Sequence, residues 1–200
     1  MLNSIGKPRP DPAVVLRNSR AREQWLQLKD GKAEALEALF RTYYDLLFNY
    51  GVKFSGHEEL TKDCIQETFA YIWERRTRLS LPESVKGYLL VAMRRQVLRA
   101  LENKARHERL QLEYGNEQPQ AAFSAEELLI FGEMADADQR RLRKAFDAIP
   151  ERMREALYLK TFNSLRYREI AEIMEVSPQV ARNYVAESLK RLRAFLGDSQ

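Results

Sequence analysis

The segment 167–185 constrains the fold of this chain more tightly than any other. Ile170 and Met174 lie about one helical turn apart, so they share one face of a short helix. Ser177 belongs to the residue types that cap helix N-termini, and Pro178 suits the first position of the helix that follows. Two helices joined by so short a connection predict a helix-turn-helix.

The second helix of this motif has two distinct faces. Its apolar residues recur at helical spacing, Val176 is the expected plug of the turn, and small Ala171 lets the two helices approach closely. The apolar seam consists of Ala181, Val185, Leu189 and Leu192. A helix-turn-helix is typical of DNA-binding proteins, although an α-hairpin with a solvated basic face would show the same spacing.

Polar side chains near the start of this second helix are suited to reading base edges in a major groove. The predicted base-contacting residues are Gln179, Arg182 and Asn183. Cations around the motif are suited to phosphates, which anchor a protein without reading sequence. The predicted phosphate contacts are Arg166, Arg168, Lys190, Arg191 and Arg193.

Helical periodicity also dominates the rest of the chain, and no alternating strand pattern occurs. We therefore predict an all-α fold of two small helical domains joined by a flexible acidic linker. The expected parts are a disordered tail (1–18), a first domain (19–106), the linker (107–136) and a helix-turn-helix domain (137–200). The expected helices cover about 21–29, 32–54, 55–76, 83–106, 136–148, 150–161, 167–174 and 178–196, with a short acidic helix from about 124. Ser55 with Glu58, and Asp136 with Gln139, have capping-box spacing.

Charge is distributed unevenly along the chain, although the formal net charge is only +4. Residues 86–109 carry seven Lys or Arg against two Glu, whereas residues 110–138 carry seven acids and no Lys or Arg. Basic residues are again in excess after 139. Two cationic blocks separated by an anionic one indicate two polyanion-binding surfaces on separate bodies. The alternative is that solvated helix faces cluster by chance.

The cellular setting is predicted from what the sequence contains. Cys64 is the single cysteine, so no intrachain disulfide is expected. No apolar run reaches the roughly 18 residues of a membrane span, and charged and proline residues from Lys7 to Pro12 interrupt any signal-peptide core. We expect a cytoplasmic protein without membrane insertion.

Further stretches resemble one protein family. Residues 25–44 are similar to the opening of the core-binding domain of extracytoplasmic-function (ECF) sigma factors, and residues 59–73 carry its pattern Asp-x-x-Gln-Glu-x-Phe-x-x-x-Trp. Residues 148–157, followed by the helix-turn-helix, are similar to the second domain of that family. The resemblance implies a non-enzymatic subunit that binds RNA polymerase core and carries it to promoter DNA. It also implies an anti-sigma factor partner, commonly membrane-bound.

The resemblance assigns roles in the first domain. Residues that would contact core polymerase are Asp63, Gln66, Glu67 and Trp73. Phe69 is expected in the core of the domain. Residues that would bind and melt the −10 element are Ser80, Lys86, Tyr88, Arg94, Arg95, Arg99 and Arg106. The loop 79–86 would hold a flipped base, and the acidic linker would either mimic RNA in polymerase channels or act as a solvated tether. Arg95 departs from the Asn that is usual in the family.

Two other classes remain open at this point. A stand-alone helix-turn-helix regulator would bind DNA without polymerase. A metal-dependent nuclease or phosphohydrolase would use Glu59, Asp63 and Glu67, but the helical-bundle sites of that kind usually add a histidine at i+3. His57 and His107 do not provide that pattern, and the sequence has no Gly-rich phosphate loop. We therefore expect no catalytic residue, no metal and no cofactor.

Overall fold

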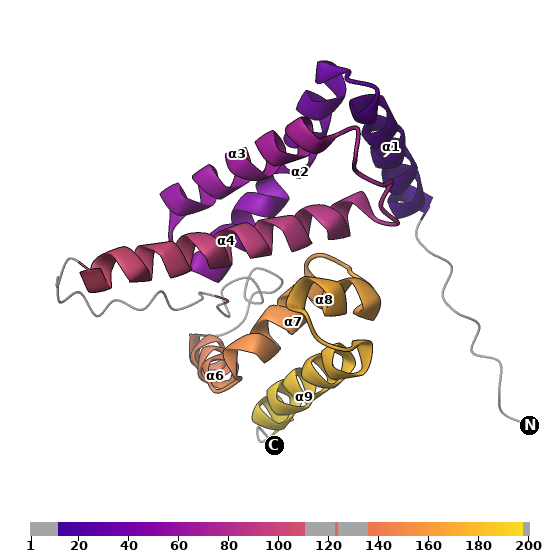
Figure 1. The fold of residues 1–200 in the computed structure, drawn as a ribbon. Helices are drawn as coiled ribbons and strands as arrows, with labels where there is room; N and C mark the ends of the chain where they lie inside the picture. Colours follow the sequence, from indigo (N-terminus) through magenta and orange to yellow (C-terminus); the bar gives the residue numbers. More distant parts are fainter. Residues whose placement is uncertain (1–11, 111–122, 124–135, 198–200) are drawn as a thin grey trace, which may run out of the picture.

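The computed structural model describes residues 12–110, 123 and 136–197. Within these ranges the regular elements are all helices, which confirms the all-α prediction (Figure 1). Their bounds are α1 (Pro12–Lys29), α2 (Ala33–Ser55), α3 (Glu58–Arg75), α4 (Val85–Leu110), α6 (Asp136–Asp147), α7 (Glu151–Thr161), α8 (Tyr167–Met174) and α9 (Pro178–Gly197). None of the helices described combines the length and apolar character needed to cross a bilayer.

The first domain packs α1 to α4 around one apolar core. Leu47 of α2, Ile65 of α3 and Leu89 of α4 are fully buried, because each helix turns its apolar stripe toward the others. At Gly51 the three helices come so close that an added Cβ would lie 2.6 Å from both Met93 Cε and Thr61 Cγ2. The absence of a side chain at this position therefore sets the spacing of the bundle.

Helix α1 braces the loop between α3 and α4. The Trp25 indole Nε1 donates to the Ser80 carbonyl at 3.1 Å, and Arg22 donates to the Pro82 carbonyl at 2.8 Å. Trp25 is fully buried, and its ring meets that of Tyr88 edge to face at 5.0 Å. Hydrogen bonds from α1 to the backbone thus hold the loop for which the family resemblance implies a flipped base.

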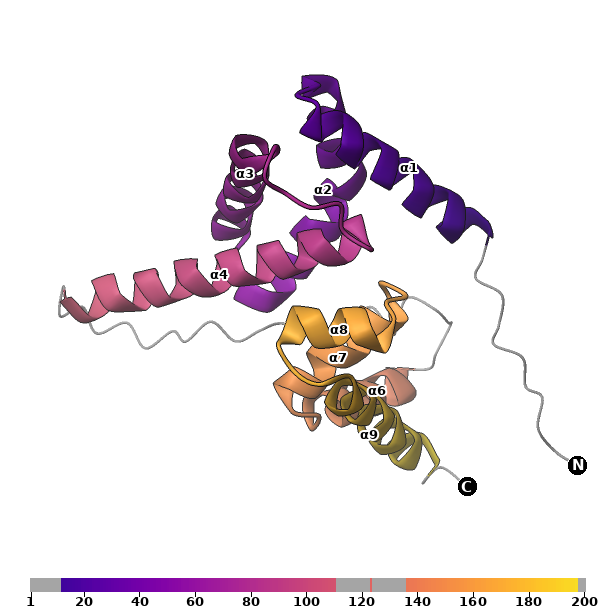
Figure 2. The same ribbon diagram turned by 45° about the vertical axis from the view of Figure 1, so that its right-hand side comes forward.

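The second domain contains α6 to α9, with α8 and α9 as the helix-turn-helix. Ile170 and Met174 of α8 and Ala181 and Val185 of α9 are buried against one another, as their spacing predicts. The turn between the helices begins at Glu175, whose φ of 55° is left-handed and ends α8. The second domain lies against α4 of the first, with α8 next to that helix (Figures 1 and 2).

Three expectations about local structure need correction. Helix α1 begins at Pro12, so residues 12–18 are helical rather than a disordered tail; proline is tolerated in a first helical turn. Ser55 does not cap α3 but ends α2 and is buried, where its hydroxyl accepts from the His57 N–H at 3.0 Å. Pro150 precedes α7 rather than entering it. The short helix expected from about 124 lies outside the described residues.

Candidate functional site

Helix α9 exposes the residues that are predicted to contact DNA bases. The Ser177 hydroxyl accepts from the Val180 N–H at 3.2 Å, which fixes the start of the helix as predicted. Gln179, Arg182 and Asn183 are all exposed. The Gln179 amide donates to the Asn183 side-chain oxygen at 2.9 Å, and the Arg182 guanidinium lies 5.4 Å from the Tyr167 ring centre. These contacts pre-order the three side chains on one face.

The cations predicted for phosphates surround this face. Arg168, Lys190 and Arg193 are exposed. Arg191 pairs with Glu187 one turn earlier at 3.2 Å. Arg166 pairs with Glu169 of its own domain at 3.2 Å and also with Glu83 of the first domain at 3.0 Å. These acids raise the pKa of Arg166, with Glu169 contributing most.

The predicted −10 residues divide into exposed and engaged groups. Arg99 and Arg106 are exposed along α4, and Ser80 is exposed in the preceding loop. Tyr88 is half-buried against Trp25, and burial raises the pKa of its phenol. The remaining cations, Lys86, Arg94 and Arg95, contact the second domain instead.

Arg94 is buried in an ion pair that joins the two domains. Its Nε lies 3.0 Å from Glu155 Oε1 of α7, and the Tyr50 hydroxyl donates to the same oxygen at 2.7 Å. The Arg94 guanidinium also stacks 4.9 Å from the centre of the Phe54 ring. Burial lowers the pKa of Arg94, but Glu155, Tyr50 and Glu175 together outweigh burial and raise it. Burial, followed by the Glu155 charge, raises the pKa of Tyr50 well above its ordinary value.

The residues expected at core polymerase form a strip along α3. Asp63, Gln66 and Glu67 are exposed, and Glu67 accepts a hydrogen bond from Gln96 of α4. Trp73 is half-buried, with the Arg76 guanidinium 4.2 Å from its ring centre. Phe69 is 5% exposed, which confirms that it belongs to the core. The structure therefore brings acidic and aromatic groups to one helix face.

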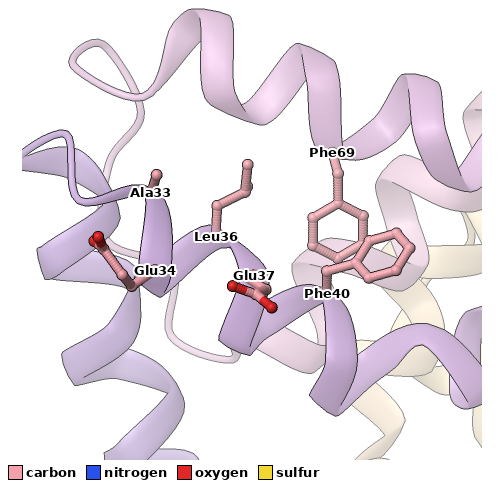
Figure 3. Close-up of a pocket in the computed structure, with 6 residues that line it drawn as sticks. All are labelled: Ala33, Glu34, Leu36, Glu37, Phe40 and Phe69. Carbon is pink, nitrogen blue, oxygen red and sulfur yellow. The ribbon is translucent and has the colours of Figure 1, made fainter.

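A pocket beside this strip was not predicted from the sequence. It lies between α2 and α3, has a volume of about 420 Å³ and is floored by Leu36, Phe40 and Phe69 (Figure 3). Glu34 and Glu37 line its α2 side, with Ala33 at the start of α2. The sequence predicts both helices, but the space between them depends on how α2 and α3 pack.

Phe123 is a second residue that the sequence did not single out. It lies within the predicted linker, yet it is only 1% exposed. Its ring centre lies 6.3 Å from that of Tyr50 and 5.3 Å from that of Tyr158, one residue from each domain. Its carbonyl accepts from Arg154 at 3.3 Å. The linker also contains Phe131 and several other apolar residues, so no signal in the sequence distinguished Phe123 as an anchor.

The carboxylates considered for a metal site do not converge. Within residues 12–110, 123 and 136–197, no three His, Cys, Asp or Glu side chains lie close enough together to hold an ion. Glu59 is instead paired with Lys62 at 2.6 Å, an exposed contact one turn along α3.

Comparison with known proteins identifies both halves of the chain. Residues 39–107 match the family described as Sigma-70 region 2, and residues 139–192 match Sigma-70, region 4. A sequence comparison with curated proteins gives no significant match.

Two examples of solved structures with a similar fold are CnrH and RpoE. CnrH in complex with the cytosolic domain of CnrY has a TM-score of 0.57 and 15% identity, and the match covers 90% of this chain and 99% of CnrH. The sigma factor RpoE from Bartonella quintana, in complex with the anti-sigma factor NepR, has a TM-score of 0.55 and 15% identity over 82% of this chain and 98% of RpoE. With region 2 in its first domain and region 4 in its second, this chain belongs to the sigma-70 family of non-enzymatic proteins that direct transcription initiation.

Proposed function

We propose that the two domains divide promoter recognition, with the first opening the −10 element and the second reading the −35 element. The observation that carries this proposal is the face of α9, where Gln179, Arg182 and Asn183 stand exposed and pre-ordered at the start of a recognition helix. The first residues of such a helix enter the major groove. Cations on both sides of them supply the anchoring contacts to phosphate.

Arg182 gives this assignment a direct test. Its guanidinium can donate two hydrogen bonds to one guanine, so Arg182→Ala should relax the preference at one −35 position by about 1–3 kcal/mol. Selection of −35 sequences by the holoenzyme measures this preference. Lys190→Ala is the control, because loss of a phosphate contact weakens binding without changing the preferred sequence. An unchanged −35 preference for Arg182→Ala would show that Arg182 does not contact bases in the major groove.

For the −10 element we propose a strand-binding face on α4 and the loop before it. Tyr88 offers an aromatic surface for a base, and Arg99 and Arg106 are exposed for the strand backbone. Stacking and backbone charge give sequence-tolerant affinity for single strands. Lys86, Arg94 and Arg95 would join this face in a form of the protein where the second domain has moved away.

We further propose that the α3 strip binds core polymerase. Asp63 and Glu67 are one helical turn apart and exposed, which suits a basic partner surface, and Trp73 offers an aromatic anchor. The pocket between α2 and α3 lies next to this strip and has an apolar floor with acids beside it. It is suited to one apolar side chain of the same partner.

Charge reversal on α3 tests the polymerase contact. Glu67→Lys should reduce co-purification with core polymerase, because it places a cation against a basic partner surface. Glu23→Lys makes the same charge change on an exposed position of α1 and should leave co-purification unaltered. Helical content measured by circular dichroism should be the same for both variants. Equal co-purification of the two variants would refute the α3 assignment.

An anti-sigma factor partner is proposed from the relatives. CnrH was crystallised with the cytosolic domain of CnrY, and RpoE with the anti-sigma factor NepR. We extend this type of partner to the present chain, together with a cytoplasmic location, where core polymerase is found. Co-expression with proteins encoded beside this chain, followed by co-purification, would identify the partner.

A further inference from the structure

The second domain covers part of the proposed −10 face with charged contacts. Glu155 is only 2% exposed and Arg94 only 8%, and their side chains pair at 3.0 Å across the domain boundary. Arg95 pairs with Glu175 of the helix-turn-helix at 3.1 Å. In both pairs a carboxylate of the second domain holds an arginine that is proposed to meet the DNA strand.

Two further contacts tie the same surfaces together. Lys86 Nζ donates to the Asn163 carbonyl at 2.6 Å, in the connection between α7 and α8. Arg166, which is proposed to bind phosphate, pairs with Glu83 of the loop before α4 at 3.0 Å. We call these four pairs the interdomain contact. Each uses a cation proposed for DNA, three from the first domain and one from the second.

Phe123 packs between the two domains, next to the buried ion pair of this contact. Its buried ring lies between Tyr50 and Tyr158, and Tyr50 in turn donates to Glu155. The linker therefore contributes an apolar anchor next to the buried ion pair.

We propose that the interdomain contact is autoinhibitory: Glu155 and Glu175 pair with Arg94 and Arg95 in place of DNA phosphates, so the two domains must separate before the protein can open a promoter. This inference rests on the proposed −10 function of Lys86, Arg94 and Arg95. It implies that the free chain adopts a closed form by itself, without polymerase or an anti-sigma factor.

The composition of the contact makes it reversible. A buried ion pair gains little over the same charges in water, because removing both from solvent offsets most of their attraction. Separation of the domains exposes Arg94, Glu155 and Tyr50 to water together, so none of them is left without a partner. Contacts between domains of one chain are commonly of this weak, polar kind.

The closed form blocks the two DNA-binding surfaces unequally. Gln179, Arg182 and Asn183 stay exposed on α9, while Lys86, Arg94 and Arg95 are engaged by the second domain. A closed chain would therefore keep its −35 reader accessible but could not hold the melted strand.

The first experiment measures domain separation in the free chain. Fluorophores on cysteines introduced at the exposed positions Ala70 of α3 and Ala194 of α9 report the distance between domains by energy transfer. Glu155→Gln should lower the ratio of closed to open chains roughly tenfold or more, because Arg94 loses its counter-ion while it stays buried. Glu187→Gln is the matched control, since Glu187 pairs with Arg191 within its own helix. Equal separations in these two variants would overturn the proposal.

The second experiment fixes the contact covalently. A Cβ built on Gly87 of α4 lies 3.7 Å from Glu169 Cγ of α8, so Gly87→Cys with Glu169→Cys should form a disulfide on mild oxidation. The pair Gly87→Cys with Glu187→Cys should not. The oxidised cross-linked chain should fail to support promoter-dependent transcription by core polymerase, and reduction should restore it.

The outcomes separate this inference from the proposed function. Failure of the Gly87/Glu169 pair to cross-link, or transcription by the oxidised form equal to that of the reduced form, would overturn the closed form or its inhibitory role. The distance measurement involves no polymerase, so it decides on the closed form by itself. If neither the unmodified chain nor the reduced variant starts transcripts, the proposed function fails, and the inhibitory role fails with it.

Discussion

Glu155 shows how one side chain acquires two tasks. It belongs to a helix of the second domain, yet its carboxylate accepts from Tyr50 and Arg94 of the first. Breaking such a buried pair inside a rigid core costs about 3–5 kcal/mol. Here the cost is limited to the free energy of separating the domains, because separation returns Arg94 to water. A residue at this interface thus affects the closed form more than the stability of either domain.

Tyr50→Phe should weaken the interdomain contact less than Glu155→Gln does. It removes one hydrogen bond to a charged acceptor, which is worth about 1.5–3 kcal/mol, but leaves the ion pair in place. We expect partial domain opening, smaller than that of Glu155→Gln, in the same energy-transfer measurement. A larger opening for Tyr50→Phe would show that the hydroxyl, rather than the ion pair, holds the domains together.

Cys64 is predicted to be unreactive in the folded chain. Burial, with smaller contributions from Glu67 and Asp63, raises the pKa of its thiol to about 11. Since the thiolate is the reactive form, alkylation by iodoacetamide at pH 8 should be roughly a hundredfold slower than in urea. The folded-state pKa lies above the unfolded one, so the stability gained from this thiol is lost as the pH rises toward 11. Equal alkylation rates with and without urea would contradict this prediction.

At the scale of elements, the sequence predicted the helices well and their partners poorly. Periodicity and the cap at Ser177 placed α8 and α9 at their observed starts, because these signals are local. The burial of Arg94 was not predictable, since its partner Glu155 lies 61 positions away and adjacent Arg95 shares the same basic pattern. The pocket beside Phe69 was missed for the same reason, because it depends on the packing of two helices.

The cap of α9 should contribute measurably to stability. Ser177→Ala removes the acceptor of the Val180 N–H and should destabilise the second domain by about 1 kcal/mol. Ser177→Asp keeps an acceptor and should retain wild-type stability. Urea denaturation followed by circular dichroism compares the three chains. Equal midpoints for Ser177→Ala and the wild type would show that the cap does not contribute.

Gly51 should resist substitution although it lies within a helix. Alanine improves helix propensity by about 1 kcal/mol, but its Cβ would overlap Met93 and Thr61, and overpacking of this kind costs about 1–3 kcal/mol. The Thr61 hydroxyl donates to the His57 carbonyl at 2.7 Å, which limits its movement. We expect Gly51→Ala to lower the melting temperature, and an increase would mean that the three helices can move apart freely.

At the scale of the whole molecule, the second domain and promoter DNA compete for the same cations of the first domain. Arg94 and Arg95 of α4 bind either the acids of the second domain or a DNA strand, so closure and strand binding compete. The exposed pairs Arg95–Glu175 and Arg166–Glu83 are open to screening by salt, whereas the buried Arg94–Glu155 pair is screened much less. We therefore expect salt to loosen the domains gradually, and Glu155→Gln to open at lower salt than the wild type. Salt-independent separation in both chains would contradict this view.

Run-off transcription with purified core polymerase is the most direct test of the division of labour between the domains. On templates selected by the holoenzyme, transcripts should require this chain. They should fall when the −35 element is altered, and Arg182→Ala should make initiation insensitive to one of its positions. If core polymerase and the reduced, unmodified chain start no transcripts together at low salt, or start them equally well without a −35 element, the account is wrong.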